Sequence, residues 1–62
     1  MLRSGDIVKH QYSGIHAVVG DTSEDGFVLF GYLVNDRTEI RWSVKEVDLV
    51  YSTEETVVNG EF

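Results

Sequence analysis

Two histidines, His10 and His16, are the side chains of this 62-residue protein best suited to metal or acid–base chemistry. They flank a turn predicted at Ser13-Gly14, so neighbouring strands are expected to bring the two imidazoles together. With Asp6 or Asp21 they would offer the nitrogen and oxygen ligands that zinc accepts. The alternative is two strand histidines with no ligand role, which we favour because the pattern fixes neither ligand number nor geometry. We therefore expect no metal site and no cofactor.

Catalytic residues are not expected either. A Ser-His-Asp set can be selected from any sequence that contains these residues, so its presence carries little weight. The chain contains no cysteine, which excludes a thiolate nucleophile, a thiolate metal site and a disulfide. A domain of this length buries a small core and has no room for the deep pocket that catalysis normally needs. The sequence indicates a protein that is not an enzyme.

Aromatic side chains offer a different chemistry, since a ring can bind a methylated ammonium group through cation–π contacts. The candidates for such a cage are Tyr12, Phe30, Tyr32, Trp42 and Tyr51. A small barrel needs large side chains to fill its interior, so we expect Phe30 and Trp42 to belong to the core. The three tyrosines have polar tips and are better candidates for the surface.

Arginine beside exposed aromatic residues is typical of protein interfaces. Tyr12, Tyr32 and Arg41 are therefore candidate contacts with a protein partner.

Carboxylates at predicted loop tips complete the candidate protein-binding surface. They belong to Glu24, Asp25, Asp36 and Glu39. If the strands between them are neighbours in the sheet, the tips are expected to lie close together and form an acidic docking face for a basic protein. The alternative is a solvated rim. A mimic of nucleic acid would need carboxylates over much of the surface, and 11 acids with 5 bases are a modest supply.

Short strands must position these residues, because no segment shows the periodicity of an amphipathic helix. Apolar, β-prone segments separated by turn signals predict strands at 6–12, 15–22, 27–34, 38–43 and 49–51, and the fourth alternates cleanly. In the fourth, Ile40 and Trp42 face one side, whereas Glu39 and Arg41 face the other.

Turn chemistry separates the predicted strands. Gly26 follows a polar cluster and is placed for a positive φ. Asn35-Asp36 is suited to a tight hairpin turn, since both residues tolerate left-handed backbone. Ser43 and Glu46 match a capping box for one helical turn at 44–47. Five strands in so short a chain predict a closed or nearly closed barrel, because closing the sheet removes exposed edges.

The predicted strand 27–34 is apolar on both faces. Phe27, Leu29 and Leu33 share one face, and Val28, Phe30, Tyr32 and Val34 share the other. Either the strand bends at Gly31 and both faces are covered, or one face is exposed to a partner. We favour the first, since glycine within a strand often marks a bend.

Charge is distributed unevenly along the chain. Residues 1–20 carry a net charge of +1, whereas residues 21–62 carry ten acids and three bases, a net of −7. An acidic chain repels phosphate backbones, so nucleic acid is not the expected partner. The charge favours either solubility alone or a partner with a basic face.

The organisation predicted is a barrel over residues 1–52 and an acidic C-terminal tail over residues 53–62. The tail is either disordered or pairs with a sheet edge of its own or a neighbouring molecule. No apolar run approaches the length of a membrane span, and no signal peptide is evident. We expect no membrane association and a cytoplasmic location, or a particle assembled in the cytoplasm.

Three segments together resemble small SH3-like barrels of the Tudor and KOW type. They are Gly5-Asp6-Ile7-Val8, Ala17-Val18-Val19-Gly20 and the run Ile40-Arg41-Trp42-Ser43-Val44-Lys45-Glu46-Val47-Asp48-Leu49-Val50. The resemblance covers about residues 5–51 and is greatest to short uncharacterised bacteriophage proteins. It implies a five-stranded SH3-like barrel with a short 3₁₀ turn before the last strand, near Val44–Val47. It also implies no catalytic residues, and binding of proteins, peptides or nucleic acids. The Ala-Leu-Tyr-Asp-Tyr segment of signalling SH3 domains is absent, so proline-rich ligands are not expected.

The function expected is a non-enzymatic protein-binding module, a phage or bacterial accessory protein that modulates a host machine or belongs to a virion. One alternative is a nucleic-acid-binding barrel that uses Lys9, His10, Arg37 and Arg41 locally. Another is a structural oligomer built through the tail or the strand edges. A monomer or a small homo-oligomer is compatible with the sequence.

Overall fold

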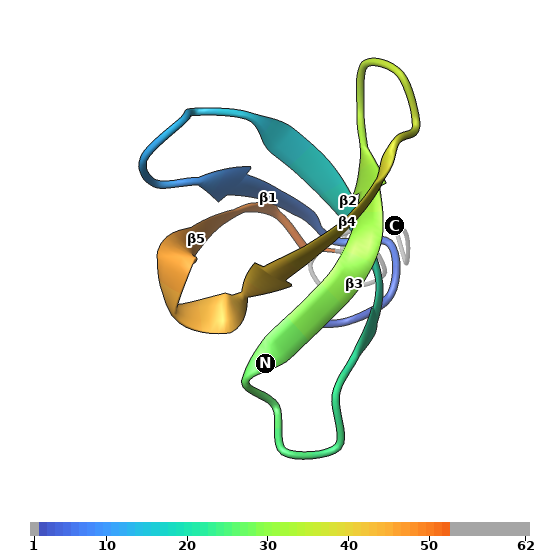
Figure 1. The fold of residues 1–62 in the computed structure, drawn as a ribbon, viewed down its shortest axis with the longest axis vertical. Coiled ribbons are helices and arrows are strands. Elements are labelled where there is room, and N and C mark those ends of the chain that lie inside the picture. Colours follow the sequence, from blue (N-terminus) through green and yellow to red (C-terminus); the bar gives the residue numbers. More distant parts are fainter. Residues whose placement is uncertain (1, 53–62) are drawn as a thin grey trace, which may run out of the picture.

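The computed structural model describes residues 2–52. They form strands β1 (Ile7–His10), β2 (His16–Thr22), β3 (Val28–Leu33), β4 (Glu39–Ser43) and β5 (Val47–Tyr51), with a 3₁₀ turn, η1 (Val44–Glu46), before the last strand. All neighbouring strands are antiparallel, and they form one sheet in the order β4-β3-β2-β1-β5 (Figure 1). The all-β prediction with five strands and a late 3₁₀ turn is thereby confirmed. The predicted tail, 53–62, lies outside the described residues.

The turns match the prediction in part. Gly26 has a φ of +79°, as expected. The β3–β4 turn is wider than the predicted Asn35-Asp36 hairpin, since the Arg37 N–H donates to the Leu33 carbonyl over 2.9 Å and Arg37 itself is left-handed, with a φ of +62°. The predicted capping box is wrong. The Ser43 side chain makes no cap hydrogen bond, because η1 is one short turn closed by the Val47 N–H on the Val44 carbonyl.

The core lies on one face of the curled sheet. The fully buried hydrophobic side chains are Val8 of β1, Ala17 and Val19 of β2, and Leu29 of β3. Half-buried side chains from the segment before β1 and from β3, β4, η1 and β5 pack against them: Leu2, Leu33, Ile40, Trp42, Val44 and Val47. The predicted alternation in β4 is confirmed, since Ile40 and Trp42 pack against the core whereas Glu39 and Arg41 are exposed.

Gly31 lies directly against the backbone of β2. A Cβ atom at this position would lie 2.0 Å from the carbonyl oxygen of Val18, a distance that no side chain can occupy. The β2–β3 register shifts between Val19 and Asp21, so β2 carries one extra residue, Gly20, opposite this contact. An irregularity of this kind bends a strand and increases its twist. Glycine at 31 therefore permits the curvature of the sheet.

The outer face of β3 is exposed. Leu29 and Leu33 take part in the core, whereas Phe30, Tyr32 and Val34 remain 42%, 40% and 48% exposed. The expectation that both faces of this strand are covered is wrong, and so is the placement of Phe30 in the core. The reason is the register: Phe30 lies opposite Arg41, which faces away from the core.

The Gly5-Asp6 motif closes a turn before β1. Asp6 is only 1% exposed, and its Oδ2 accepts a hydrogen bond from the Arg3 N–H over 2.8 Å. The Asp6 carbonyl accepts from the Val19 N–H over 2.8 Å, while the Gly5 N–H donates to the Val19 carbonyl over 2.7 Å. Gly5 has a φ of +94°, which favours glycine. The motif thus fastens the start of the chain to β2.

Helices that could cross a membrane do not occur within residues 2–52.

Candidate functional site

The outer face of β3 and β4 presents exposed side chains from both strands. Phe30 lies opposite Arg41, and Tyr32 lies opposite Glu39. Directly opposite residues on one face of a sheet have Cβ atoms about 5 Å apart, so the side chains of each pair are neighbours. Two aromatic rings, one guanidinium and one carboxylate therefore share this face.

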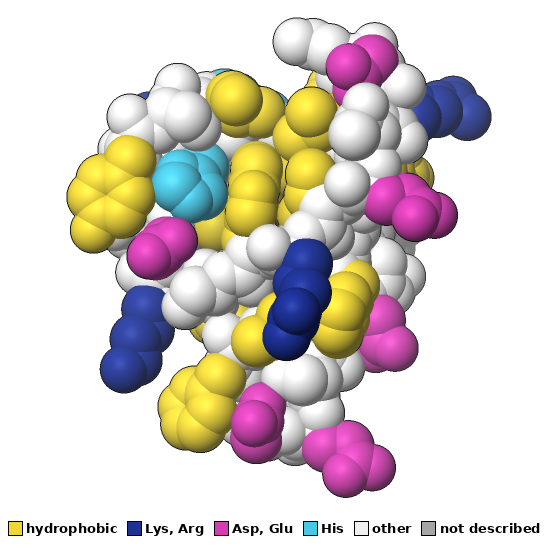
Figure 2. Space-filling view, viewed as in Figure 1, with side chains coloured by type: hydrophobic (Ala, Val, Ile, Leu, Met, Phe, Trp, Pro, Cys, Tyr) yellow, Lys and Arg dark blue, Asp and Glu magenta, His cyan; other side chains and the backbone are white. Residues whose placement is uncertain are grey.

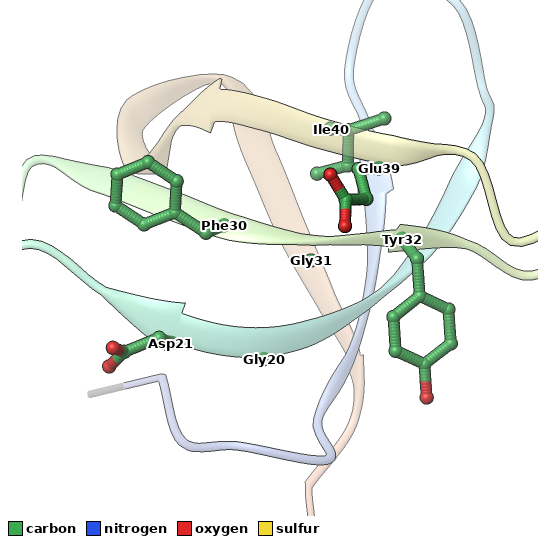
Figure 3. Close-up of a pocket in the computed structure, with 7 residues that line it drawn as sticks. All are labelled: Gly20, Asp21, Phe30, Gly31, Tyr32, Glu39 and Ile40. Atoms are coloured by element: carbon green, nitrogen blue, oxygen red, sulfur yellow. The ribbon is translucent and has the colours of Figure 1, made fainter.

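An open depression of about 340 Å³ lies on this face (Figure 3). Three adjacent strands line it, with Gly20 and Asp21 from β2, Phe30, Gly31 and Tyr32 from β3, and Glu39 and Ile40 from β4. In Figure 3, Phe30 and Tyr32 lie on opposite sides of Gly31, and the Glu39 carboxylate extends over β3 between them. Gly20 and Gly31 carry no side chains, and this leaves the space between the rings open. We call this feature the Phe30–Tyr32 depression.

The carboxylates of the depression are not neutralised within the described part of the chain. Asp21 Oδ1 accepts a hydrogen bond from the Thr22 N–H over 2.8 Å, and neither Asp21 nor Glu39 forms an ion pair with a described residue. Arg41, which lies opposite Phe30 on the same face, also forms no ion pair with a described residue. Aromatic rings beside unpaired carboxylates are suited to a cationic side chain, which gains Coulomb and cation–π attraction together.

Tyr12 lies apart from this face, in the turn between β1 and β2, and is 80% exposed. Its ring meets His10 edge-on, with 5.7 Å between centroids, and His10 meets Trp42 in the same manner at 4.9 Å. His10 Nε2 lies 3.4 Å from Glu46 Oε1. This cluster fixes the β1–β2 turn against η1, and Trp42 packs against the core as predicted. The five aromatic residues do not form one cage.

The acidic loop tips are separated, contrary to the prediction of one patch. Glu24 and Asp25 lie in the turn that precedes β3, and Asp36 lies in the turn that follows it, so the two turns occupy opposite ends of the strand (Figure 1). Successive hairpins of an antiparallel sheet must point in opposite directions. Figure 2 shows acidic side chains spread over the visible face of the molecule, whereas the Lys and Arg side chains in view are separated from one another.

Both turn aspartates organise the backbone around them. Asp25 Oδ1 accepts from the Ser23 hydroxyl over 2.6 Å and from the Phe27 N–H over 3.1 Å. These hydrogen bonds, the Ser23 one first, lower the pKa of Asp25 below its ordinary 3.8. The Thr38 N–H, which donates to Asp36 Oδ1 over 3.0 Å, likewise lowers the pKa of Asp36. Both carboxylates are explained as turn residues.

Replacing Asp25 by asparagine is expected to lower stability in a pH-dependent manner. Because the folded-state pKa lies below 3.8, ionised Asp25 stabilises the fold above pH 3.8, and this contribution is lost as the pH falls through the lowered pKa. Thermal unfolding midpoints of the wild type and Asp25→Asn should therefore differ at neutral pH and converge in acid. A difference that persists unchanged in acid would show that the charge of Asp25 plays no part.

The two histidines lie on adjacent strands but do not meet. Lys9 is the residue opposite His16, so His10 and His16 project from opposite faces of the β1–β2 pair. His10 is half-buried against Trp42, whereas His16 is exposed. Within residues 2–52 no group of three or more histidine and acidic side chains could hold a metal ion.

The register explains which site residues sequence reasoning missed. Asp21, Phe30 and the glycines at 20 and 31 line the depression. From the sequence, Phe30 is expected in the core, Asp21 is considered only as a metal ligand, and the two glycines are assigned to no site. The alternation in β4 assigns Arg41 to the outer face, but only the pairing of Arg41 with Phe30 extends that assignment to β3. The extra residue in β2 that brings Gly20 beside Gly31 has no comparable signal.

Comparison of the chain with protein-family models, with curated proteins and with solved structures finds no match.

Proposed function

We propose that this protein is a non-enzymatic SH3-like barrel that binds another protein through the Phe30–Tyr32 depression. The curled sheet supports a barrel. After the 3₁₀ turn, β5 returns to pair with β1, and half-buried side chains from β4, η1 and β5 pack on one core. The resemblance to short phage barrels favours an accessory role, either as a modulator of a host machine or as a virion component.

The observation that carries the proposal is the pair of exposed rings on β3. Phe30 and Tyr32 are 42% and 40% exposed although each belongs to a central strand, and the glycines between them leave an open concavity. Aromatic residues in concave sites are typical anchors of protein interfaces. Asp21 and Glu39 add negative charge, so the expected partner presents a lysine or arginine side chain on a basic face.

The test is retention of partner proteins from an extract of the source organism on immobilised variants. Tyr32→Ala and Asp21→Lys are expected to weaken binding, the first by about tenfold or more, since a buried tyrosine anchor contributes about 2 kcal/mol. Tyr12→Ala and Glu24→Lys are matched controls, because each removes the same chemical group from an exposed turn outside the depression. Equal retention by all four variants would contradict the proposed site.

A further inference from the structure

The free edge of β4 offers unpaired backbone groups. β4 is at the end of the strand order and pairs only with β3. Two hydrogen bonds show which residues of β4 bond to β3. The Leu33 N–H donates to the Thr38 carbonyl over 2.8 Å, and the Val44 N–H donates to the Phe27 carbonyl over 2.9 Å. Hydrogen-bonded pairs alternate along an antiparallel ladder. Ile40 and Trp42 therefore bond to β3, while Glu39, Arg41 and Ser43 direct their N–H and C=O groups away from it.

Two features that block an exposed edge, a β-bulge and a proline, are absent from this strand. The β3–β4 register runs without a shift from Ser43 to Glu39, so no bulge turns the edge aside. The chain contains no proline. No further backbone hydrogen bond reaches Glu39 or Arg41 from the rest of residues 2–52, and the β3–β4 hairpin projects from the body of the sheet (Figure 1). Such an edge is a template for another strand.

The sequence of β4 is complementary to itself in the antiparallel direction. If two copies pair about a two-fold axis through Ile40, Glu39 of each lies opposite Arg41 of the other. Both residues direct their backbone groups to the free edge, so this register places hydrogen-bonded pairs where the groups are available. Both side chains are exposed, lie on the same outer face and lack an ion-pair partner among the described residues. Opposite charges directly across a strand pair stabilise it.

We propose that the protein forms a two-fold dimer through the β4 edges, with two Glu39–Arg41 pairs across the interface. The half-buried Ile40 of each copy faces its counterpart at the axis, in a narrow pair with about 4.5 Å between Cα atoms. The outer faces of the two sheets become continuous, so both Phe30–Tyr32 depressions open on the same side. Arg41 of each copy then pairs with Glu39 at the rim of the other copy's depression, so in the dimer Asp21 is the carboxylate of the depression that attracts a cationic partner.

Charge exchange tests this interface. Glu39→Arg and Arg41→Glu each place like charges opposite one another at both pairs of a homodimer, so each variant is expected to be monomeric, with a dissociation constant raised at least about tenfold. The double variant Glu39→Arg/Arg41→Glu restores complementarity and is expected to dimerise like the wild type. An equimolar mixture of the two single variants should form a heterodimer, because arginines of one then face glutamates of the other.

Sedimentation velocity over a concentration series measures these masses, and amide hydrogen exchange locates the interface. In the wild type, the amides of Glu39 and Arg41 should gain protection as the concentration rises. A wild type that stays monomeric at millimolar concentration would overturn the proposal, as would a double variant or a mixture that does not recover the dimer. Circular dichroism of each variant separates loss of pairing from loss of the fold. The partner-binding test with Tyr32→Ala reports separately on the proposed function, because Tyr32 is on β3 and does not belong to the β4 edge.

Discussion

Replacing Gly31 by alanine is expected to unfold the protein. The added Cβ would lie 2.0 Å from the Val18 carbonyl oxygen and 3.2 Å from the Val19 Cα, and all of these atoms belong to the backbone of β2. Backbone atoms cannot rotate away as a flexible side chain does, so β2 and β3 must separate. Overpacking within a core costs about 1–3 kcal/mol, and separation of two central strands costs more. A domain of this length has a total stability of only about 3–9 kcal/mol.

Gly20→Ala is the matched control for this prediction. A Cβ at Gly20 would meet the Phe30 carbonyl oxygen at 3.4 Å and the Gly31 Cα at 3.8 Å, which are ordinary contacts. Gly20→Ala should therefore fold like the wild type. Urea unfolding followed by the fluorescence of Trp42, the single tryptophan, measures both variants. A Gly31→Ala protein with wild-type stability would show that β2 and β3 are not held as closely as described.

The fold could be predicted from the sequence wherever one face of a strand is polar. In β4, Glu39 and Arg41 alternate with Ile40 and Trp42, so period and direction follow from the residue types, and the structure agrees. β3 is apolar on both faces, so its residue types do not say which face is buried. Only the pairing of Phe30 with Arg41 settles it, and pairing is a long-range property.

The candidate site was predictable in its chemistry and less so in its assembly. The sequence predicts Tyr32, Glu39 and Arg41 as contact residues, and the three do share one face. Tyr12 and the turn acids Glu24, Asp25 and Asp36 lie elsewhere, because the direction of each hairpin depends on the order of strands in the sheet. Residue types at loop tips carry no information about that order.

Asp6 shows a further limit of reasoning from residue types. Gly5-Asp6 belongs to the segments that resemble SH3-like barrels, and a carboxylate is ordinarily exposed. The structure buries it, at 1% exposure, as the acceptor of the Arg3 N–H. No buried side-chain polar atom within residues 2–52 lacks a hydrogen-bond partner. The motif is therefore explained by a closed turn that joins the start of the chain to β2.

Asp6→Ala is expected to lower the free energy of unfolding by about 1–3 kcal/mol, because the Arg3 N–H loses its acceptor and a buried side chain is truncated. Asp6→Asn keeps a side-chain oxygen and removes the charge, so its stability should fall between those of Asp6→Ala and the wild type. Urea unfolding followed by Trp42 fluorescence ranks the three proteins. The opposite order, with alanine more stable than asparagine, would indicate that burial of a polar group at this position outweighs its hydrogen bonds. The expected order would show that the buried, hydrogen-bonded side chain of Asp6 stabilises the turn before β1.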